Sequence, residues 1–472
     1  MTGGDHSPSP DKPSSEQRPA RGLGGGEHGM ADGYHRAEGS HRPAEGDHSP
    51  FPDGQFRPGE PSPEPGPIRN PEPIEAAQGL NRGLDRTRLH SRHLDEGGRL
   101  GSVFGFDLPL EYAAGREAEY WTVRRGAGLT DADFMRRLMI RGPAALGFLQ
   151  FVTISDMADL PVGQIGYTAL CDREGQLLDT VTVLRSGADE YLLTADAARV
   201  PDHLLQAVYG FKADVVDVSE EAVMLTLQGP GSASILSKAL AVDLGRLRIR
   251  ESQPFRLRGH PLRITRFGFT GQAGFELLLA PPLAPALWDR LLAEGARPCG
   301  YLAAEDLRIE AGFISMDKER GNPFENRLGH LVAWEKDHFL GREALIEIME
   351  VGLEKILVWL SLDIAAGPAA WLPRRPDSTA MRSRRPSAAE AAERTVRSGA
   401  SIISGDRTIG QVSSVGFSWA GRLGLALGYV WPEFALDEGR YILNNRQGRQ
   451  PARLSTRPPR ISSAAGRPAG RK

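Results

Sequence analysis

The sequence contains very little cysteine, because only Cys171 and Cys299 occur in 472 residues. Two thiols exclude a framework of several disulfides and a four-cysteine metal site, and they favour a reducing compartment. No apolar run reaches the length of a membrane span, and the first residues lack the apolar core that an export signal carries. A net charge of −3 gives no basic excess that would point to nucleic acid. These absences predict a soluble cytoplasmic protein with no metal site and no nucleic-acid or membrane partner.

Aliphatic residues are also scarce in the first part of the chain, where Pro, Gly, Ser, Glu and His dominate. Residues 1–97 cannot bury enough apolar surface to offset the entropy of ordering, so they are predicted to be a disordered tail. Four histidines recur in this segment without the His-x3-His spacing of a metal site: His28, His35, His41 and His48. A solvated tail is the simpler interpretation. Residues 456–472 are predicted to be a second disordered tail.

The pattern between residues 101 and 335 predicts an α+β region of two subdomains. A strand, a Gly-Pro turn and a helix follow one another twice, at Gly142-Pro143 and at Gly229-Pro230. This repetition indicates an internal pseudo-repeat. From residue 336 to 455, short strands broken by glycine predict a small C-terminal β-barrel domain, with an insertion loop at 365–397.

The most informative stretch lies between two apolar runs, at residues 262–279. Gly268, Gly271 and Gly274 mark a tight turn, since glycine allows positive φ and a close approach of the backbone to a ligand. Glu276 then stands among Phe275 and Leu277. Strand alternation permits its side chain to point to water, whereas a buried carboxylate would need a partner. The local sequence leaves both alternatives open.

Several blocks of the chain, in order and spacing from about residue 104 to 455, resemble the folate-binding aminomethyltransferase family. This family includes the T-protein of the glycine cleavage system and related demethylases. The blocks include Leu225–Pro230, Gly268–Glu276, Leu307–Gly312, Phe339–Leu345 and Ala426–Tyr429. The resemblance implies three domains around a central cavity for tetrahydrofolate. It also implies transfer of a one-carbon unit to that cofactor from a methylated or aminomethyl donor, either a small molecule or a group on a carrier protein.

The resemblance also implies roles for individual residues. Glu276 matches the carboxylate that accepts hydrogen bonds from the pterin ring. The other cofactor contacts are expected at Phe269, Asp196, Arg308 and Leu192. Three positions depart from the family pattern: Phe269 replaces a tyrosine, Asp196 replaces an asparagine, and Ala304 replaces an arginine.

The catalytic position is altered as well. The family's catalytic aspartate matches Thr180, and Asp179 directly precedes it, so both residues are catalytic candidates. Neighbouring residues of a strand point to opposite faces, and a shift by one residue therefore turns a carboxylate to the wrong side. A β-bulge would restore its direction. Without a bulge, Asp179 is a structural acid near the hairpin turn.

Two functions follow from this resemblance. The first is a tetrahydrofolate-dependent aminomethyltransferase, methyltransferase or demethylase with an altered catalytic acid. The second is a non-catalytic folate-binding or assembly protein on the same scaffold. Iron–sulfur assembly relatives carry a cysteine motif that the surroundings of Cys299 do not match, so the enzyme is the favoured hypothesis.

Overall fold

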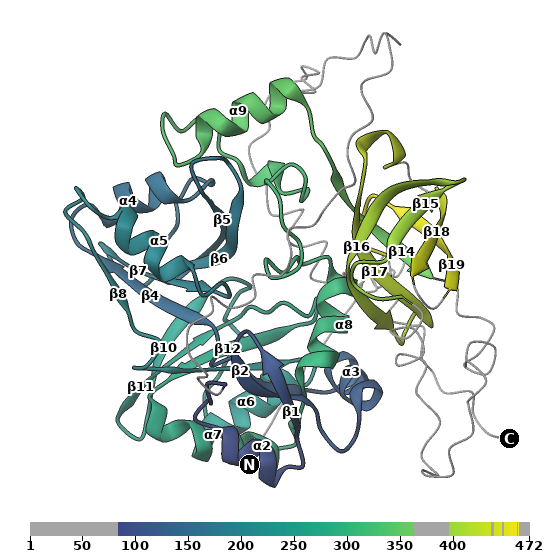
Figure 1. Ribbon diagram of the computed structural model, residues 1–472. Helices are drawn as coiled ribbons and strands as arrows, with labels where there is room; N and C mark the ends of the chain where they lie inside the picture. Colours follow the sequence, from purple (N-terminus) through teal and green to yellow (C-terminus); the bar gives the residue numbers. More distant parts are fainter. Residues whose placement is uncertain (1–83, 363–395, 436–438, 446–447, 460, 462–472) are drawn as a thin grey trace, which may run out of the picture.

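The computed structural model describes residues 84–362, 396–435, 439–445, 448–459 and 461 (Figure 1). Residues 1–83 of the predicted N-terminal tail lie outside the described part, as do most of the predicted insertion loop and most of the predicted C-terminal tail. Among the described residues, no helix is long and apolar enough to cross a membrane.

A six-stranded sheet forms the lower body in Figure 1, with the strand order β10-β11-β12-β9-β3-β13. Its strands are β3 (Gly128–Asp131), β9 (Val223–Gln228), β10 (Ser252–Leu257), β11 (His260–Thr265), β12 (Gly274–Leu279) and β13 (Arg297–Pro298). Helices α6 (Ser232–Leu240) and α7 (Ala284–Ala293) contribute Leu236 and Trp288 to the core on one face of this sheet, where Phe275, Leu277 and Leu279 are buried. Alternation along β12 therefore turns Glu276 to the opposite face.

A five-stranded sheet has the order β5-β6-β7-β4-β8. Its strands are β4 (Arg136–Arg141), β5 (Ile165–Cys171), β6 (Leu177–Arg185), β7 (Glu190–Ala195) and β8 (Asp214–Asp217), and helices α4 (Ala145–Val152) and α5 (Val200–Ala207) cover one face. The predicted strand, Gly-Pro turn and helix unit occurs in both sheets. Gly142 and Gly229 adopt φ of 122° and 125°, and a Cβ at Gly229 would lie 2.4 Å from the Gly126 carbonyl oxygen. Only glycine fits this turn.

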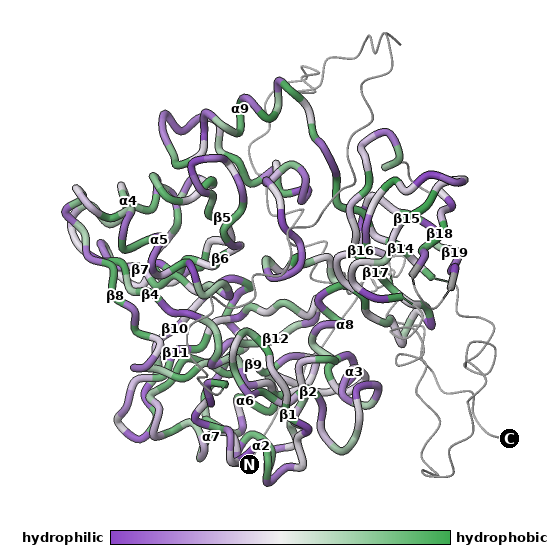
Figure 2. Tube along the Cα trace, in the orientation of Figure 1, coloured by the Kyte–Doolittle hydropathy of each residue, from purple (hydrophilic) through white to green (hydrophobic). Residues whose placement is uncertain are grey.

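Six strands close a barrel in the order β14-β17-β16-β15-β18-β19, which confirms the predicted C-terminal barrel. They are β14 (Ile356–Leu362), β15 (Ser401–Ser404), β16 (Arg407–Ser418), β17 (Leu423–Val430), β18 (Arg440–Asn445) and β19 (Gly448–Ser455). Figure 2 shows the hydrophobic residues mainly on strands and helices, and the hydrophilic residues mainly in the connections. The described part also contains α3 (Arg116–Arg125), α8 (Tyr301–Ala311) and α9 (Arg342–Val351), with short 3-10 turns at Pro281–Leu283, Gly329–Leu331 and Pro432–Phe434.

The prediction that the disordered tail extends to residue 97 is wrong. Helix α2 (His90–Asp95) precedes a two-stranded sheet of β1 (Arg99–Val103) and β2 (Phe106–Glu111). Leu89 and His93, four residues apart, are both fully buried. The His93 ring nitrogens lie 2.9 Å from Asp131 Oδ2 and 2.9 Å from the Tyr112 hydroxyl. These partners lie far away in the sequence, so the composition of residues 84–97 gave no sign that the segment folds.

A buried ion pair connects the N-terminal part of the fold to the barrel. The Arg116 guanidinium on α3 donates to both carboxylate oxygens of Asp306 on α8, at 2.7 and 2.6 Å. Asp306 also accepts the backbone N–H of Phe417 on β16 at 2.6 Å and the indole N–H of Trp419 at 3.3 Å. One carboxylate therefore joins α3, α8 and the barrel. Burial raises the pKa of Asp306 to about 6, and the Arg116 charge opposes this shift.

We expect Asp306→Ala to lower the free energy of unfolding by about 3–5 kcal/mol, because it leaves the buried Arg116 charge without its carboxylate. Urea titration monitored by tryptophan fluorescence measures this change. The matched control is Arg99→Ala, which removes an exposed ion pair with Glu111 and should change stability by about 0.5 kcal/mol or less. Equal effects of the two variants would contradict the structural role of the Arg116–Asp306 pair.

Candidate functional site

The glycine-rich turn between β11 and β12 is built around the side chain of Gln228. Its amide nitrogen donates to the Phe267 carbonyl oxygen at 3.1 Å, and the Thr270 hydroxyl donates to its amide oxygen at 3.2 Å. A Cβ at Gly268 or Gly274 would lie 2.0 or 2.5 Å from this amide group. The prediction of positive φ holds for Gly271 alone among the three glycines. Gly268 and Gly274 instead leave room for Gln228, which fixes the start of β12.

Glu276 lies in a row of polar side chains that crosses the six-stranded sheet. Direct cross-strand partners share one face of a sheet. Thr265 on β11 and Thr226 on β9 are the two partners of Glu276, and the row continues to Ser252 on β10 and Thr130 on β3. The Thr265 hydroxyl donates to the Ser252 hydroxyl at 2.8 Å. The face opposite the apolar core therefore presents one carboxyl group flanked by hydroxyl groups.

The Glu276 carboxyl group is buried, and no described residue pairs with it. Its residue is 8% exposed, and no hydrogen bond or ion pair to it occurs within the described part of the chain. Burial raises the pKa of Glu276 to about 8, and the nearby negative charge of Asp196 adds to this shift. A buried carboxylate without a partner is costly. The alternative in which Glu276 points to bulk water is excluded by its burial.

Phe269 and Leu192, both predicted as cofactor contacts, lie close together between the two sheets. They share an apolar cluster with Phe267, Leu278 and Leu184. Leu278 is two residues from Glu276 on the same strand and therefore on the same face. The ring of Phe269 packs edge-on against Phe267 and Phe313, with centroid distances of 5.1 and 5.3 Å. An apolar and aromatic wall thus borders the polar row that contains Glu276.

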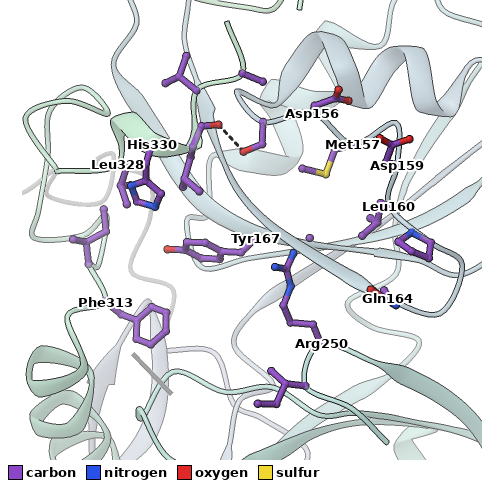
Figure 3. A pocket seen from close by; sticks show the side chains of 18 of the residues that line it. Asp156, Met157, Asp159, Leu160, Gln164, Tyr167, Arg250, Phe313, Leu328 and His330 are labelled. Carbon is purple, nitrogen blue, oxygen red and sulfur yellow. Dashed lines mark hydrogen bonds between the residues drawn. The ribbon is translucent and has the colours of Figure 1, made fainter. Parts of the chain in front are cut away.

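A cavity of about 810 Å³ opens next to this wall (Figure 3). Tyr167 and Phe313 line it from facing segments, and their ring centroids are 6.2 Å apart. The guanidinium of Arg250 and the ring of His330 point into the same space in Figure 3. The Nε of Arg250 donates to the Ile165 carbonyl oxygen at 3.0 Å, which holds this side chain at the wall. The cavity is large enough for a small organic molecule.

The five-stranded sheet turns a second set of polar residues toward the six-stranded sheet. Thr182 on β6 is the cross-strand partner of both Tyr167 on β5 and Thr194 on β7. Leu184 and Leu192 lie on the same face and share an apolar cluster with Leu278 on β12 and with Phe267 after β11, so the two faces meet. Thr180 belongs to this face by alternation, and its hydroxyl is hydrogen-bonded to Tyr167. Thr180 therefore points toward the space between the sheets, as the resemblance implies.

Asp179 points the other way, and the hypothesis that it is a catalytic acid does not fit this geometry. Its neighbours on the same face, Val181 and Val183, belong to the core under α4 and α5. Its carboxylate accepts three backbone N–H groups, from Thr180 at 2.8 Å and from Asp196 and Ala197 at 2.7 Å each. A β-bulge is present at the end of this hairpin, but it leaves the side chain of Asp179 on the core side. Asp179 is the structural acid that the alternation predicts.

Asp196, in contrast, is positioned by Asp179 and directed toward the site. It follows β7 directly, and extension of the pairing of Thr182 with Thr194 brings it opposite Thr180. Its Oδ1 atom is buried and has no hydrogen-bond partner among the described residues. Burial raises the pKa of Asp196 to about 8, and the charge of Asp179 contributes to the increase.

Arg308, predicted as a cofactor contact, is already paired within the protein. Its Nε and one terminal nitrogen donate to the two carboxylate oxygens of Glu305, at 2.8 and 2.7 Å. Its other terminal nitrogen donates to the Phe313 carbonyl oxygen at 2.5 Å and to Glu319 at 3.3 Å. These carboxylates raise the pKa of Arg308 above its ordinary value although burial opposes the shift. Arg308 therefore fixes the loop that carries Phe313.

Three residues near the predicted site were not predicted as site residues. Tyr167 and Phe313 line the cavity, and Thr226 is the cross-strand partner of Glu276. Tyr167 belongs to a strand whose alternation in principle reveals its face. Phe313 follows the end of α8 at Gly312, and nothing in the local sequence distinguishes it from a core phenylalanine. Thr226 becomes recognisable only through its pairing with Glu276.

The comparisons with known proteins identify two matching family models. The GCVT N-terminal domain matches residues 89–336, and the glycine cleavage T-protein C-terminal barrel domain matches residues 387–459. An aminomethyltransferase of Thermus thermophilus is 34% identical over 381 residues, which cover 79% of this chain and 99% of that protein. An aminomethyltransferase of Streptomyces coelicolor is 33% identical over 366 residues, with 75% and 91% covered. The crystal structure of glycine cleavage system aminomethyltransferase T from Bartonella henselae aligns with a TM-score of 0.68 and 26% identity, over 79% of this chain and 98% of that chain.

The raised pKa of Glu276 predicts a loss of stability with rising pH. The folded protein keeps a proton on Glu276 up to about pH 8, whereas the unfolded chain loses it near the ordinary pKa of 4.5. Titration of Glu276 therefore leaves the free energy of unfolding unchanged below about pH 4.5 and lowers it progressively as the pH rises to about 8. We expect Glu276→Gln to raise the thermal midpoint by about 2 °C or more near pH 9, with a smaller gain near pH 5. Scanning calorimetry at both pH values measures this difference, and an equal or negative shift at pH 9 would contradict it.

Proposed function

Because the chain belongs to the glycine cleavage T-protein family, we propose that it is a tetrahydrofolate-dependent aminomethyltransferase-like enzyme. In this proposal, it moves a one-carbon unit from a methylated or aminomethyl donor to tetrahydrofolate. The observation that carries the proposal is the Glu276 carboxyl group, which is buried, has no partner among the residues that the structure describes, and is flanked by hydroxyl groups.

The donor set around Glu276 fits a pterin. A pterin carries a ring N–H and an amino group side by side, and a carboxylate accepts both in a charge-assisted pair. Such a pair would satisfy the group that the protein leaves unpaired. Thr226 and Thr265 stand on either side of Glu276 and can meet the neighbouring polar atoms of a ring, while Phe269 and Leu192 offer apolar contact to its flat faces.

The protein's part in the transfer is binding and orientation. Tetrahydrofolate, when bound, supplies the nucleophilic nitrogen that receives the one-carbon unit. Glu276 holds one end of the pterin, and the wall of Phe269, Phe313 and Tyr167 excludes water beside it. Orientation of two reactants in such a site supplies a large part of the barrier reduction.

We propose that the one-carbon donor enters from the cavity lined by Tyr167 and Phe313, because the ring of Phe313 also packs against Phe269 at the predicted cofactor site. We propose either a small-molecule donor or a donor group attached to a carrier protein. The cavity lining carries Asp156, Asp159 and Glu335 together with Arg250 and His330, so it offers polar groups of both signs to a donor.

A non-catalytic folate-binding or assembly protein is the second candidate. The side chain of Asp179 favours it, because it faces the core instead of the site. The resemblance also matches Thr180, which has no carboxylate, to the family's catalytic acid. Both candidates require Glu276 to hold the pterin, and only the enzyme requires transfer from a donor.

We expect Glu276→Ala to weaken binding of 5-formyltetrahydrofolate by about 10- to 100-fold, since hydrogen bonds to a charged group contribute about 1.5–3 kcal/mol. Isothermal titration calorimetry measures the affinity. The matched control is Glu117→Ala on the exposed side of α3, which should leave the affinity unchanged. Unaltered binding by Glu276→Ala would remove the basis of the proposal.

A donor screen separates the two candidates. The wild-type protein is incubated with tetrahydrofolate and methylated or aminomethylated amines, and the products are separated by chromatography. We expect methylene- or methyltetrahydrofolate with at least one donor. Folate binding without product from any donor, including the aminomethylated carrier protein, would favour the non-catalytic candidate.

A further inference from the structure

We propose that Asp196 is the catalytic carboxyl group of this site and that it contacts a cationic, amine-type one-carbon donor. Asp179 faces the core, whereas Asp196, directly after the neighbouring strand β7, lies opposite Thr180 on the side of the site. The inference rests on the proposed function, because it names the residue and the donor class for the same site.

The backbone of Asp196 is fixed from the core side. The Oδ2 atom of Asp179 accepts the N–H of Asp196 and the N–H of Ala197, each at 2.7 Å. These two bonds hold the first residues after β7 in one conformation. Asp179 is therefore a positioning residue, and Asp196 is the acid that it directs toward the space between the sheets.

The carboxyl group of Asp196 lacks the partners that a structural acid has. Its Oδ1 atom is buried and unpaired within the described residues, whereas Asp179 accepts three N–H groups and Asp306 is paired with Arg116. Glu276 on the facing sheet is unpaired as well, within the same part of the chain. Of these two unpaired buried carboxyl groups on facing walls, Glu276 is assigned to the pterin in the proposed function, which leaves Asp196 to pair with the donor.

The charges around Asp196 favour a cation. Titratable groups on four elements interact electrostatically with Asp196. They are Asp179 on β6, Tyr167 on β5, Glu276 on β12, and Tyr301, Glu305 and Arg308 on α8. Arg308 is the one cation among them, and Glu305 and Glu319 already pair with it. The surroundings are therefore negative, which keeps a proton on Asp196 until a cation binds.

A protonated amine satisfies these conditions. Its N–H groups donate to Asp196, and its positive charge stabilises the ionised carboxylate, which reverses the effect of burial. The proton of Asp196 is then released as the donor binds. In the transfer, a bond would form between the folate nitrogen and the one-carbon unit, and the bond from that carbon to the donor nitrogen would break, with the amine leaving with the electron pair. The Asp196 carboxylate would then accept the proton that the attacking nitrogen loses, a contribution of about 10²–10⁴-fold to the rate for a group of this kind.

The first test uses the protein without folate and compares Asp196→Asn with Asp214→Asn, an exposed acid on β8. Because ionisation of the buried acid opposes folding, Asp196→Asn should raise the thermal midpoint near pH 9 and change it little near pH 5. Dimethylammonium chloride should stabilise the wild type and Asp214→Asn near pH 9 more than sodium chloride of the same ionic strength. It should give no such extra stabilisation to Asp196→Asn. A lower midpoint of Asp196→Asn at both pH values, or equal stabilisation of all three proteins, would overturn the proposal.

The second test uses transfer to tetrahydrofolate. Asp196→Asn should lower kcat by about 10²–10⁴-fold and keep affinity for 5-formyltetrahydrofolate within about threefold of wild type. Retained kcat would overturn the role of Asp196 and leave the proposed function intact. Absence of folate binding by the wild type would instead overturn the proposed function, and the cation test would still decide on Asp196.

Discussion

The structure of the site depends on one unfavourable arrangement, a carboxyl group in the interior without a partner in the described part of the protein. Along β12, Phe275, Leu277 and Leu279 are drawn into the apolar core by the same alternation that turns Glu276 to the other face. The strong packing of the three apolar residues fixes the register, so Glu276 cannot rotate to water. Burial of the unpaired carboxyl group therefore costs free energy in the folded protein, and a ligand that pairs with the group recovers this free energy on binding.

The strand register determines whether Asp179 and Asp196 point toward the core or toward the site. Asp179 and Thr180 are neighbours in sequence, yet one faces the helices and the other faces the opposite sheet. The core-facing acid finds three backbone N–H groups and becomes part of the scaffold. The scaffold in turn directs Asp196 toward Glu276. On α8, Asp306 joins α3 to the barrel, and Arg308 fixes the loop that carries Phe313 and donates to Ser414 of the barrel.

Local signals in the sequence predicted those parts of the fold that local interactions decide. The strand, Gly-Pro turn and helix unit predicted at 142–143 and 229–230 occurs in both sheets, where Gly142 and Gly229 adopt positive φ. Helix α2 was not predicted, because its burial depends on contacts with Asp131 and Tyr112, which are distant in sequence. The direction of Asp179 followed from alternation, whereas the importance of Asp196 emerged only when the pairing of β6 with β7 and the unpaired Oδ1 atom were known. Arg308 matched the family pattern, but its pairing with Glu305 could not be read from spacing alone.

The number of protons released on folate binding measures the state of Glu276 most directly. Calorimetric titration of 5-formyltetrahydrofolate in buffers of different ionisation enthalpy gives this number. With a pKa of about 8 before binding and an ionised carboxylate against the pterin afterwards, we expect release of about one proton near pH 7 and almost none near pH 9. Glu276→Gln should release none at either pH. Binding without proton release by the wild type near pH 7 would contradict a buried, protonated Glu276 that ionises to hold the pterin.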